Sequence, residues 1–132
     1  MKSPYVNNID RETHKNDDFR KVVFTGEKLQ LVLMNIQPGE DIGGEVHSNV
    51  DQFFRIESGS GKAIINDKEY EIKTDFGIVV PAKSKHNIIN TGNEPMKLYS
   101  IYAPPQHEPG KIEHKISEMI IPTFENYINE NK

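Results

Sequence analysis

The sequence of 132 residues contains no cysteine. The chain can therefore form neither a disulfide bond nor a thiolate metal site. Any metal ion must be held by His, Asp, Glu, Gln or Asn side chains. This absence narrows the possible metal chemistry before any motif is considered.

Long apolar runs and an excess of basic residues are also missing. No apolar run reaches the roughly 18 residues that a membrane-spanning helix needs, and the opening residues MKSPYVNNIDRETHKNDD lack the apolar core of a signal peptide. Lys and Arg number 16 against 20 Asp and Glu, a formal charge of −4. A protein that binds nucleic acid or a membrane surface would show a basic face. We therefore expect neither as a partner, and a cytoplasmic location is the simplest prediction.

The length suits one domain with a single core. Residues 1–18 are polar and interrupted by Pro4, which predicts an N-terminal arm outside the core. Residues 19–115 form the expected β domain. Residues 116–132 are predicted to be a C-terminal extension with a short helix, because Ile120, Phe124 and Ile128 recur at helical spacing.

Short β-rich runs alternate with turn residues through the predicted domain, and no helical period interrupts them. This pattern is typical of an all-β sandwich or barrel rather than a parallel α/β sheet. The expected strands are 22–25, 29–36, 45–48, 52–57, 62–66, 69–73, 76–80, 86–89 and 97–102.

Two of these runs carry apolar residues on both faces. In 29–36, Leu31 and Leu33 share one face while Val32 and Met34 share the other. Both faces must then be covered, either by a second sheet or by a partner chain. The adjacent pair Phe53-Phe54 repeats this pattern, and a homodimer in which sheets pack across subunits is expected.

Polar side chains with metal-binding capacity gather around the start of the fourth predicted strand. Glu45 and His47 are two residues apart and share a strand face. Gln52 opens the next strand on the face of Phe54, and His86 opens a later strand. Two imidazoles, a carboxylate and an amide oxygen suit Fe(II), Mn(II), Zn(II), Co(II) or Ni(II), with one or two positions left for water or substrate. The alternative is a polar interior that binds only water or an organic ligand.

Two stretches resemble the motifs of the cupin superfamily. Residues 38–61 are similar to G-x5-H-x-H-x3–4-E-x6-G, with Glu45 at the first His position and Gln52 at the Glu position. Residues 75–90 are similar to G-x5-P-x-G-x2-H-x3-N, matching at Pro81, His86 and Asn90. The stretches DQFFRIESGSG and VPAKSKHNIINTG extend the likeness to small bacterial single-domain cupins over about residues 18–115. Some members of that group are labelled mannose-6-phosphate isomerase-like.

The resemblance implies a double-stranded β-helix, a jelly-roll barrel with a metal ion near one mouth. It assigns the ligand roles to Glu45, His47, Gln52 and His86. Two of these depart from the usual His-His-Glu-His set, but the exchange keeps one carboxylate, so the formal ligand charge is unchanged. That favours a retained metal site.

Catalytic residues beyond the ligands are not fixed by the sequence. The segment PPQHEPG places His107 where it can act as an acid or base if the segment folds over the mouth, and surface exposure is the alternative. Tyr99 and Tyr102 lie on opposite faces of the last predicted strand, so one should point inward, with core packing as the simpler role.

Three functions remain open from the sequence. The first is a metal-dependent enzyme, of isomerase or oxygenase type, that acts on a small polar or anionic substrate. The second is a non-catalytic module that binds or senses a small molecule. The third is a structural dimer with a vestigial site, and the fold alone does not decide among them.

Overall fold

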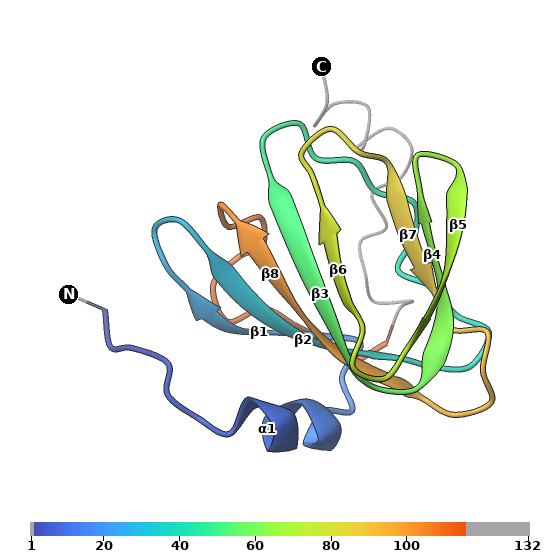
Figure 1. The fold of residues 1–132 in the computed structure, drawn as a ribbon. Helices are drawn as coiled ribbons and strands as arrows, with labels where there is room; N and C mark the ends of the chain where they lie inside the picture. The colour runs from blue at the N-terminus through green and yellow to red at the C-terminus, as the bar shows by residue number, and fades with distance from the viewer. Residues whose placement is uncertain (1, 116–132) are drawn as a thin grey trace.

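The computed structural model describes residues 2–115, which form two antiparallel sheets and one short helix (Figure 1). The predicted C-terminal helix lies outside the described residues. Eight of the nine expected strands are confirmed to within a few residues. The elements are α1 (Ile9–Lys15), β1 (Arg20–Thr25), β2 (Gln30–Ile36), β3 (Asp51–Ser58), β4 (Ser60–Ile65), β5 (Lys68–Lys73), β6 (Gly77–Val80), β7 (His86–Ile89), β8 (Met96–Ala103) and β9 (Ile112–Glu113).

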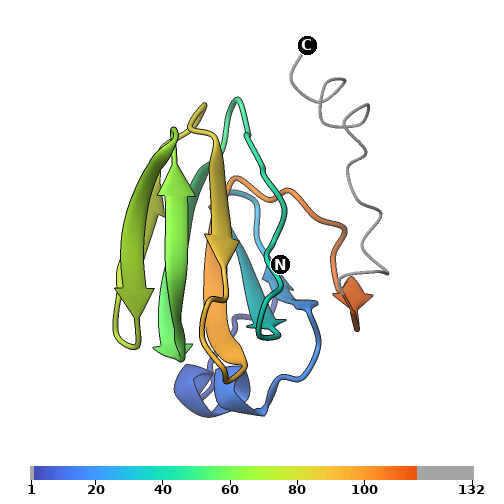
Figure 2. The same ribbon diagram turned by 90° about the vertical axis from the view of Figure 1, so that its right-hand side faces the viewer.

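The two sheets face each other as a sandwich. The larger has the order β6-β3-β8-β2-β1-β9 and the smaller has the order β5-β4-β7. Figure 2 views the molecule from the side of the smaller sheet. Strands far apart in sequence are neighbours, since β2 and β3 both pair with β8.

The prediction of a closed jelly-roll barrel is wrong in one respect, because the sheets do not join. Strands β5 and β6 are the edge strands on one side, and they are not paired with each other. Side chains from both strands, including Tyr70, Ile72, Ile78 and Val79, line a groove of about 460 Å³. Packed side chains hold two sheets about 10 Å apart, twice the spacing of hydrogen-bonded strands, so the edges stay separate.

The core fills the space between the sheets. Alternate residues of the large sheet point inward, among them Val32, Phe54 and Leu98, each fully buried. Ala63 and Ile88 meet them from the small sheet. Because strand side chains alternate between faces, this pattern also fixes which polar residues point inward.

The outer face of the large sheet is partly covered by the N-terminal residues, which we predicted to be a simple arm. Asn8 caps helix α1 by accepting a hydrogen bond from the Arg11 amide, and the helix contacts β2, β3 and β8 (Figure 1). Thr13 is fully buried there, and Tyr5 and Leu33 line one small pocket. The outer face of β2 thus lies against this chain's own N-terminal residues at Leu33 and Asn35, where Asn35 Nδ2 donates to the Asp17 carbonyl. In residues 2–115, no helix is long and apolar enough to cross a membrane.

The expected strand at 45–48 does not form. Residues 41–45 instead run beside β7 and make only isolated bridges, Asp41 with Ile89 and Glu45 with His86. Gly43 has a positive φ of 83°, a conformation that favours glycine and interrupts regular pairing.

Candidate functional site

Backbone pairing brings the predicted site residues to one end of the sandwich. Glu45 and His86 exchange two backbone hydrogen bonds, both of 2.8 Å. The Lys83 amide donates to the His47 carbonyl at 2.7 Å, which ties the loop after Glu45 to the loop before β7. Gln52 comes from the facing sheet, where its inward direction follows the alternation of β3.

The four predicted ligand side chains converge. Glu45 Oε2 lies 3.3 Å from His47 Nε2 and 3.7 Å from His86 Nε2. Gln52 Oε1 lies 3.1 Å from His86 Nε2. Donor atoms that share a metal ion at about 2.1 Å lie about 3.0 to 3.4 Å apart. The Glu45–His47 and Gln52–His86 separations fall within that range, whereas the Glu45–His86 separation exceeds it and the His47 and His86 ring centroids are 6.1 Å apart.

The hydrogen bonds of His86 give a second reason why this group suits a cation. His86 Nδ1 lies 3.2 Å from the Ser84 carbonyl oxygen, which can only accept, so the tautomer with a proton on Nδ1 satisfies this contact. Burial lowers the pKa of His86, against the opposing effect of the Glu45 charge. In the neutral ring, Nε2 then points its lone pair at Gln52 Oε1 and Glu45 Oε2, and a cation between the three atoms would satisfy them all.

Buried charge at this end of the sandwich is unbalanced. Arg20 Nη1 lies 3.0 Å from Glu113 Oε1, and Arg20 Nη2 lies 3.6 Å from Glu45 Oε1. All three side chains are about 90% or more buried, so one positive charge faces two negative ones. Lys111 approaches Glu113 at 3.9 Å, but its side chain is one-third exposed. A buried net charge is costly unless it is paired, and a divalent cation beside Glu45 would reverse its sign.

The Glu45 carboxylate is ionised in this setting. Burial alone would raise its pKa, but the hydrogen bond from His47 and the charge of Arg20 outweigh burial and hold the pKa below its usual value. An ionised carboxylate is the form that coordinates a metal ion.

Tyr102 and His107 lie next to the four side chains. Tyr102 is the inward-facing tyrosine of β8, and its ring is 6.1 Å from that of His47 and 4.9 Å from that of His107. Burial raises the pKa of the Tyr102 hydroxyl far above its usual value, with a further effect of the Glu45 charge, so the phenol stays protonated. Burial lowers the pKa of His107 to about 3, with a further effect of the Arg20 charge, so the imidazole stays neutral.

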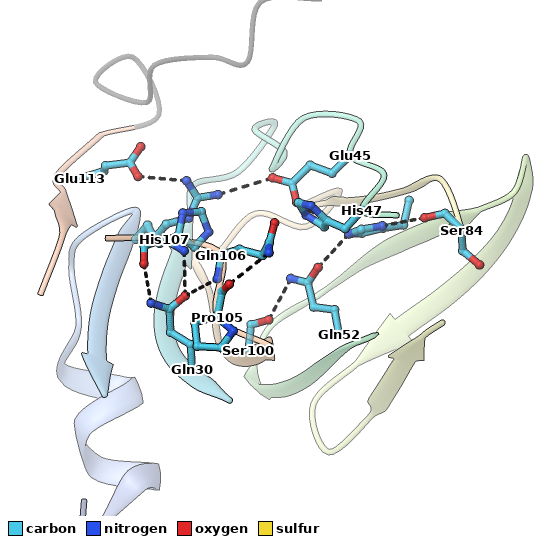
Figure 3. A network of polar contacts seen from close by, with 12 residues as sticks. Gln30, Glu45, His47, Gln52, Ser84, Ser100, Pro105, Gln106, His107 and Glu113 are labelled. Carbon is cyan, nitrogen blue, oxygen red and sulfur yellow. Dashed lines mark hydrogen bonds and ion pairs between the residues drawn. The ribbon is translucent and has the colours of Figure 1, made fainter. Parts of the chain in front are cut away.

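Gln30 holds the segment 104–107 in place. Its side chain is fully buried, and its Oε1 accepts from the backbone amides of Gln106 and His107 at 3.0 and 2.9 Å. Its Nε2 donates to the His107 carbonyl at 2.7 Å and to Thr25 Oγ1 at 3.0 Å. Figure 3 shows Gln30 beneath this segment, with His107 on the side of the network nearer Glu113.

Tyr99, the remaining predicted candidate, and several other polar side chains lie away from this group. Tyr99 faces outward against Phe53, with ring centroids 6.4 Å apart. Asp51, which precedes Gln52, accepts from the Ala82 amide at 2.9 Å, and Arg55 pairs with Asp75 at 2.9 Å. His114 Nδ1 lies 2.6 Å from Asp18 Oδ1 on the surface.

A second group of ligand-type side chains lies on the outer face. Asp10 and His14 of α1 meet Glu57 of β3, with one ligand atom of each within 4.8 Å of the others. Asp10 and His14 are exposed, whereas Gln52 and His86 are each only 2% exposed. Burial and then a hydrogen bond with Asp10 raise the pKa of Glu57, so a shared proton can hold these two carboxylates together.

Sequence reasoning missed Arg20, Gln30, Ser100 and Glu113. Gln30 and Ser100 are polar residues at inward-facing positions of otherwise apolar strands. The alternation of inward and outward side chains along each strand could have revealed them. Ser100 accepts from Gln52 Nε2 at 2.9 Å and so orients the amide. Arg20 and Glu113 are 93 residues apart, and nothing local in the sequence predicts their contact.

Comparisons with known proteins agree with this architecture. The family model described as "Cupin domain" matches residues 32–102. An uncharacterized protein of Bacillus subtilis, YrkC, is 49% identical over 115 residues, which is 83% of this chain and 62% of that protein. An uncharacterized protein of Acanthamoeba polyphaga mimivirus is 42% identical over 113 residues, 83% of this chain and 71% of that protein. The chain thus spans about 62% of the length of the Bacillus subtilis relative.

A solved structure is similar in three dimensions. The crystal structure of BH2720 from Bacillus halodurans superposes with a TM-score of 0.86 and is 45% identical, covering 88% of this chain and 92% of that one.

Proposed function

The chain belongs to the cupin family, and from that premise we propose that it is a metal-dependent enzyme acting on a small polar substrate. Glu45, His47, Gln52 and His86 hold the divalent ion, which is Zn, Mn, Fe, Ni or Co. The reaction is of the isomerase or oxygenase type.

One observation carries this proposal. The lone pair of His86 Nε2 faces two acceptor oxygens, Gln52 Oε1 at 3.1 Å and Glu45 Oε2 at 3.7 Å. Atoms that only accept do not usually meet in this way unless a proton or a cation lies among them. The buried excess of one negative charge over Arg20, Glu45 and Glu113 supports the same reading.

The residues around the ion supply proton chemistry and orientation. A bound ion of this kind polarises a carbonyl or hydroxyl oxygen as a Lewis acid, and iron would add one-electron chemistry. Neutral His107 and protonated Tyr102 can each donate a hydrogen bond to a substrate oxygen, whereas the low pKa of His107 makes it a weak base. Arg20 contacts Glu45 Oε1, whereas His47 and His86 lie near Glu45 Oε2, so Arg20 helps to orient the carboxylate.

A non-catalytic module that binds a small molecule is the second candidate. It is favoured by the burial of Tyr102, which is 1% exposed and lies against His107. Because the Tyr102 side chain is shielded from solvent, a ligand bound next to it would leave slowly, which suits retention of a ligand better than rapid exchange of substrate and product.

Elemental analysis of protein purified without a metal-affinity tag tests the metal site. We expect about one equivalent of a divalent metal per chain, and an increase in melting temperature when Mn(II), Fe(II), Zn(II), Co(II) or Ni(II) is added to stripped protein. The Glu45→Gln and His86→Gln variants should lose both effects. His14→Gln is the matched control, because it alters the exposed group on the outer face and should bind metal normally.

The outcomes separate the candidates. Wild-type protein that contains no metal, and whose melting temperature no ion changes, contradicts the metal site. Metal-dependent turnover in a substrate screen, retained in His14→Gln and lost in His107→Gln, supports the enzyme over the binding module.

A further inference from the structure

Three buried polar atoms near the proposed metal site have no hydrogen-bond partner among the described residues. They are Arg20 Nε, His107 Nε2 and Glu113 Oε2. The Arg20 and Glu113 side chains are each 4% exposed. Buried polar atoms are almost always hydrogen-bonded, so three such atoms together indicate a missing polar partner.

These atoms belong to one group of contacts. Arg20 and Glu113 are joined by their 3.0 Å ion pair. His107 lies close enough to Arg20 for the guanidinium charge to lower its pKa, and its ring contacts Tyr102. Arg20 also reaches Glu45, the carboxylate of the proposed metal site. A small molecule that reached all three atoms would therefore also lie near the Glu45 carboxylate.

The hydrogen-bonding capacity of the three atoms indicates which groups a ligand must offer them. Arg20 Nε always bears a proton and only donates, and a neutral imidazole nitrogen can also donate. Glu113 Oε2 only accepts while the carboxylate is ionised. The missing partner therefore offers acceptor oxygens to two donors and a hydroxyl donor to one acceptor.

Charge decides between a neutral polyol and an anion. Arg20, Glu45 and Glu113 together carry one net negative charge, and a divalent ion changes that sum to one net positive charge. A monoanion then neutralises the buried group, whereas a neutral sugar leaves it charged.

We propose that Arg20, His107 and Glu113 form a subsite for a small 2-hydroxy acid. The carboxylate of the acid accepts hydrogen bonds from Arg20 Nε and His107 Nε2, and its hydroxyl donates to Glu113 Oε2. The substrate of the proposed enzyme would then be a 2-hydroxy acid. The charge balance of this subsite rests on the proposed metal ion.

The side-chain NMR signal of Arg20 provides a direct test. The chain has only three arginines, Arg11, Arg20 and Arg55, so three Nε–Hε signals are expected, and the Arg20→Lys variant identifies the one from Arg20. We would titrate L-lactate into Zn(II)-loaded protein. Lactate should move the Arg20 signal and leave the signals of Arg11 and Arg55 in place, whereas lactamide and glycerol, the neutral counterparts, should move none of them.

Variants test the other two contacts. His107→Phe and Glu113→Gln should each weaken lactate binding by about tenfold or more, the loss expected for one buried hydrogen bond to a charged group. Glu108→Gln, a change at an exposed residue of the same segment, should leave the affinity unchanged. Melting curves of each variant establish that it is folded.

The result that overturns the subsite is an Arg20 signal that does not respond to lactate, or that responds equally to lactamide, in protein shown to bind Zn(II). Repeating the titration with metal-stripped protein separates this failure from failure of the metal site. If Zn(II) does not bind but lactate still moves the Arg20 signal, the contacts of the subsite stand, whereas the metal proposal and the charge argument that depends on it both fail.

Discussion

At the scale of single residues, His107 should make the stability of the protein sensitive to acid. Its pKa falls to about 3 in the folded chain because the imidazole is buried next to Arg20, whereas an unfolded histidine has a pKa of about 6.5. Between these values the unfolded chain binds a proton that the folded chain does not. The free energy of unfolding therefore falls as the pH falls through this window.

We predict that His107→Phe is less sensitive to acid than the wild type. From about pH 7 to about pH 5, the His107 contribution should lower the free energy of unfolding by about 1 to 2 kcal/mol in the wild type. Urea unfolding followed by circular dichroism at both pH values measures this difference. The exposed control His14→Gln should keep the wild-type sensitivity, and an identical pH response of His107→Phe and wild type would contradict the prediction.

The sequence predicted that the four ligand side chains lie close together. The prediction rested on the alternation of side chains along a strand and on the spacing within the motifs, and both can be read from short stretches of sequence. The inward face of Gln52 is confirmed by its 2% exposure. Arg20 could not be found in the same way, since its partners Glu45 and Glu113 reach it only through the packing of distant strands. A metal-binding role for the four residues stays a prediction.

At the scale of elements, the segment 104–107 depends on one amide. Gln30 satisfies the backbone amides of Gln106 and His107 and the carbonyl of His107. Proline-rich segments form few backbone hydrogen bonds of their own, so this side chain takes the place of a strand partner.

We predict that Gln30→Leu destabilises the protein by about 2 to 4 kcal/mol, because it leaves buried backbone groups without partners. Urea unfolding measures the loss. Gln37→Leu, a change at an exposed residue just beyond β2, is the control and should cost little. If both variants were equally stable, the segment would be held by other contacts.

Helix α1 was missed even though its signals are present in the sequence. Asn8 stands at the N-cap, Asp10 and Glu12 lie in the first turn, and His14 and Lys15 lie in the last, as expected for a capped helix. The polar composition of residues 1–18 obscured this pattern. Strand β9 has only two residues, too few to produce any alternation.

At the scale of the whole molecule, an apolar row crosses the outer face of the large sheet. One residue from each of five neighbouring strands lies in register there. The row is Phe24, Leu31, Ile101, Phe53 and Val79. Val79 is 67% exposed, and antiparallel sheets bury such faces by packing against another layer.

We predict a homodimer that packs through this row. A twofold axis through the central Ile101 would place Phe53 of one chain on Leu31 of the other and Val79 on Phe24, so the row is complementary to itself. Phe53→Lys should convert the dimer to a monomer in light scattering coupled to gel filtration. Tyr70→Lys, at an exposed residue of the small sheet, should not, and a wild-type monomer at high concentration would contradict the prediction.

The layered β architecture could be predicted because turn residues and short β-rich runs recur along the chain. Closure of the barrel could not be predicted from the sequence, because it depends on whether the two edge strands β5 and β6 come within hydrogen-bonding distance. Their side chains line the groove between them instead, and the size of that groove is a property of the packed sandwich alone.

The pairing of β1 with β9 has a consequence for synthesis on the ribosome. Glu113 follows Arg20 by 93 residues, so at about 5 to 20 residues per second β9 emerges about 5 to 20 s after β1. Until then β1 is a bare sheet edge, open to pairing with another nascent chain. Arg20 is an inward-pointing charge on that strand, a feature that discourages such pairing, so we expect the residue that later contacts Glu45 also to disfavour aggregation of the unfinished chain.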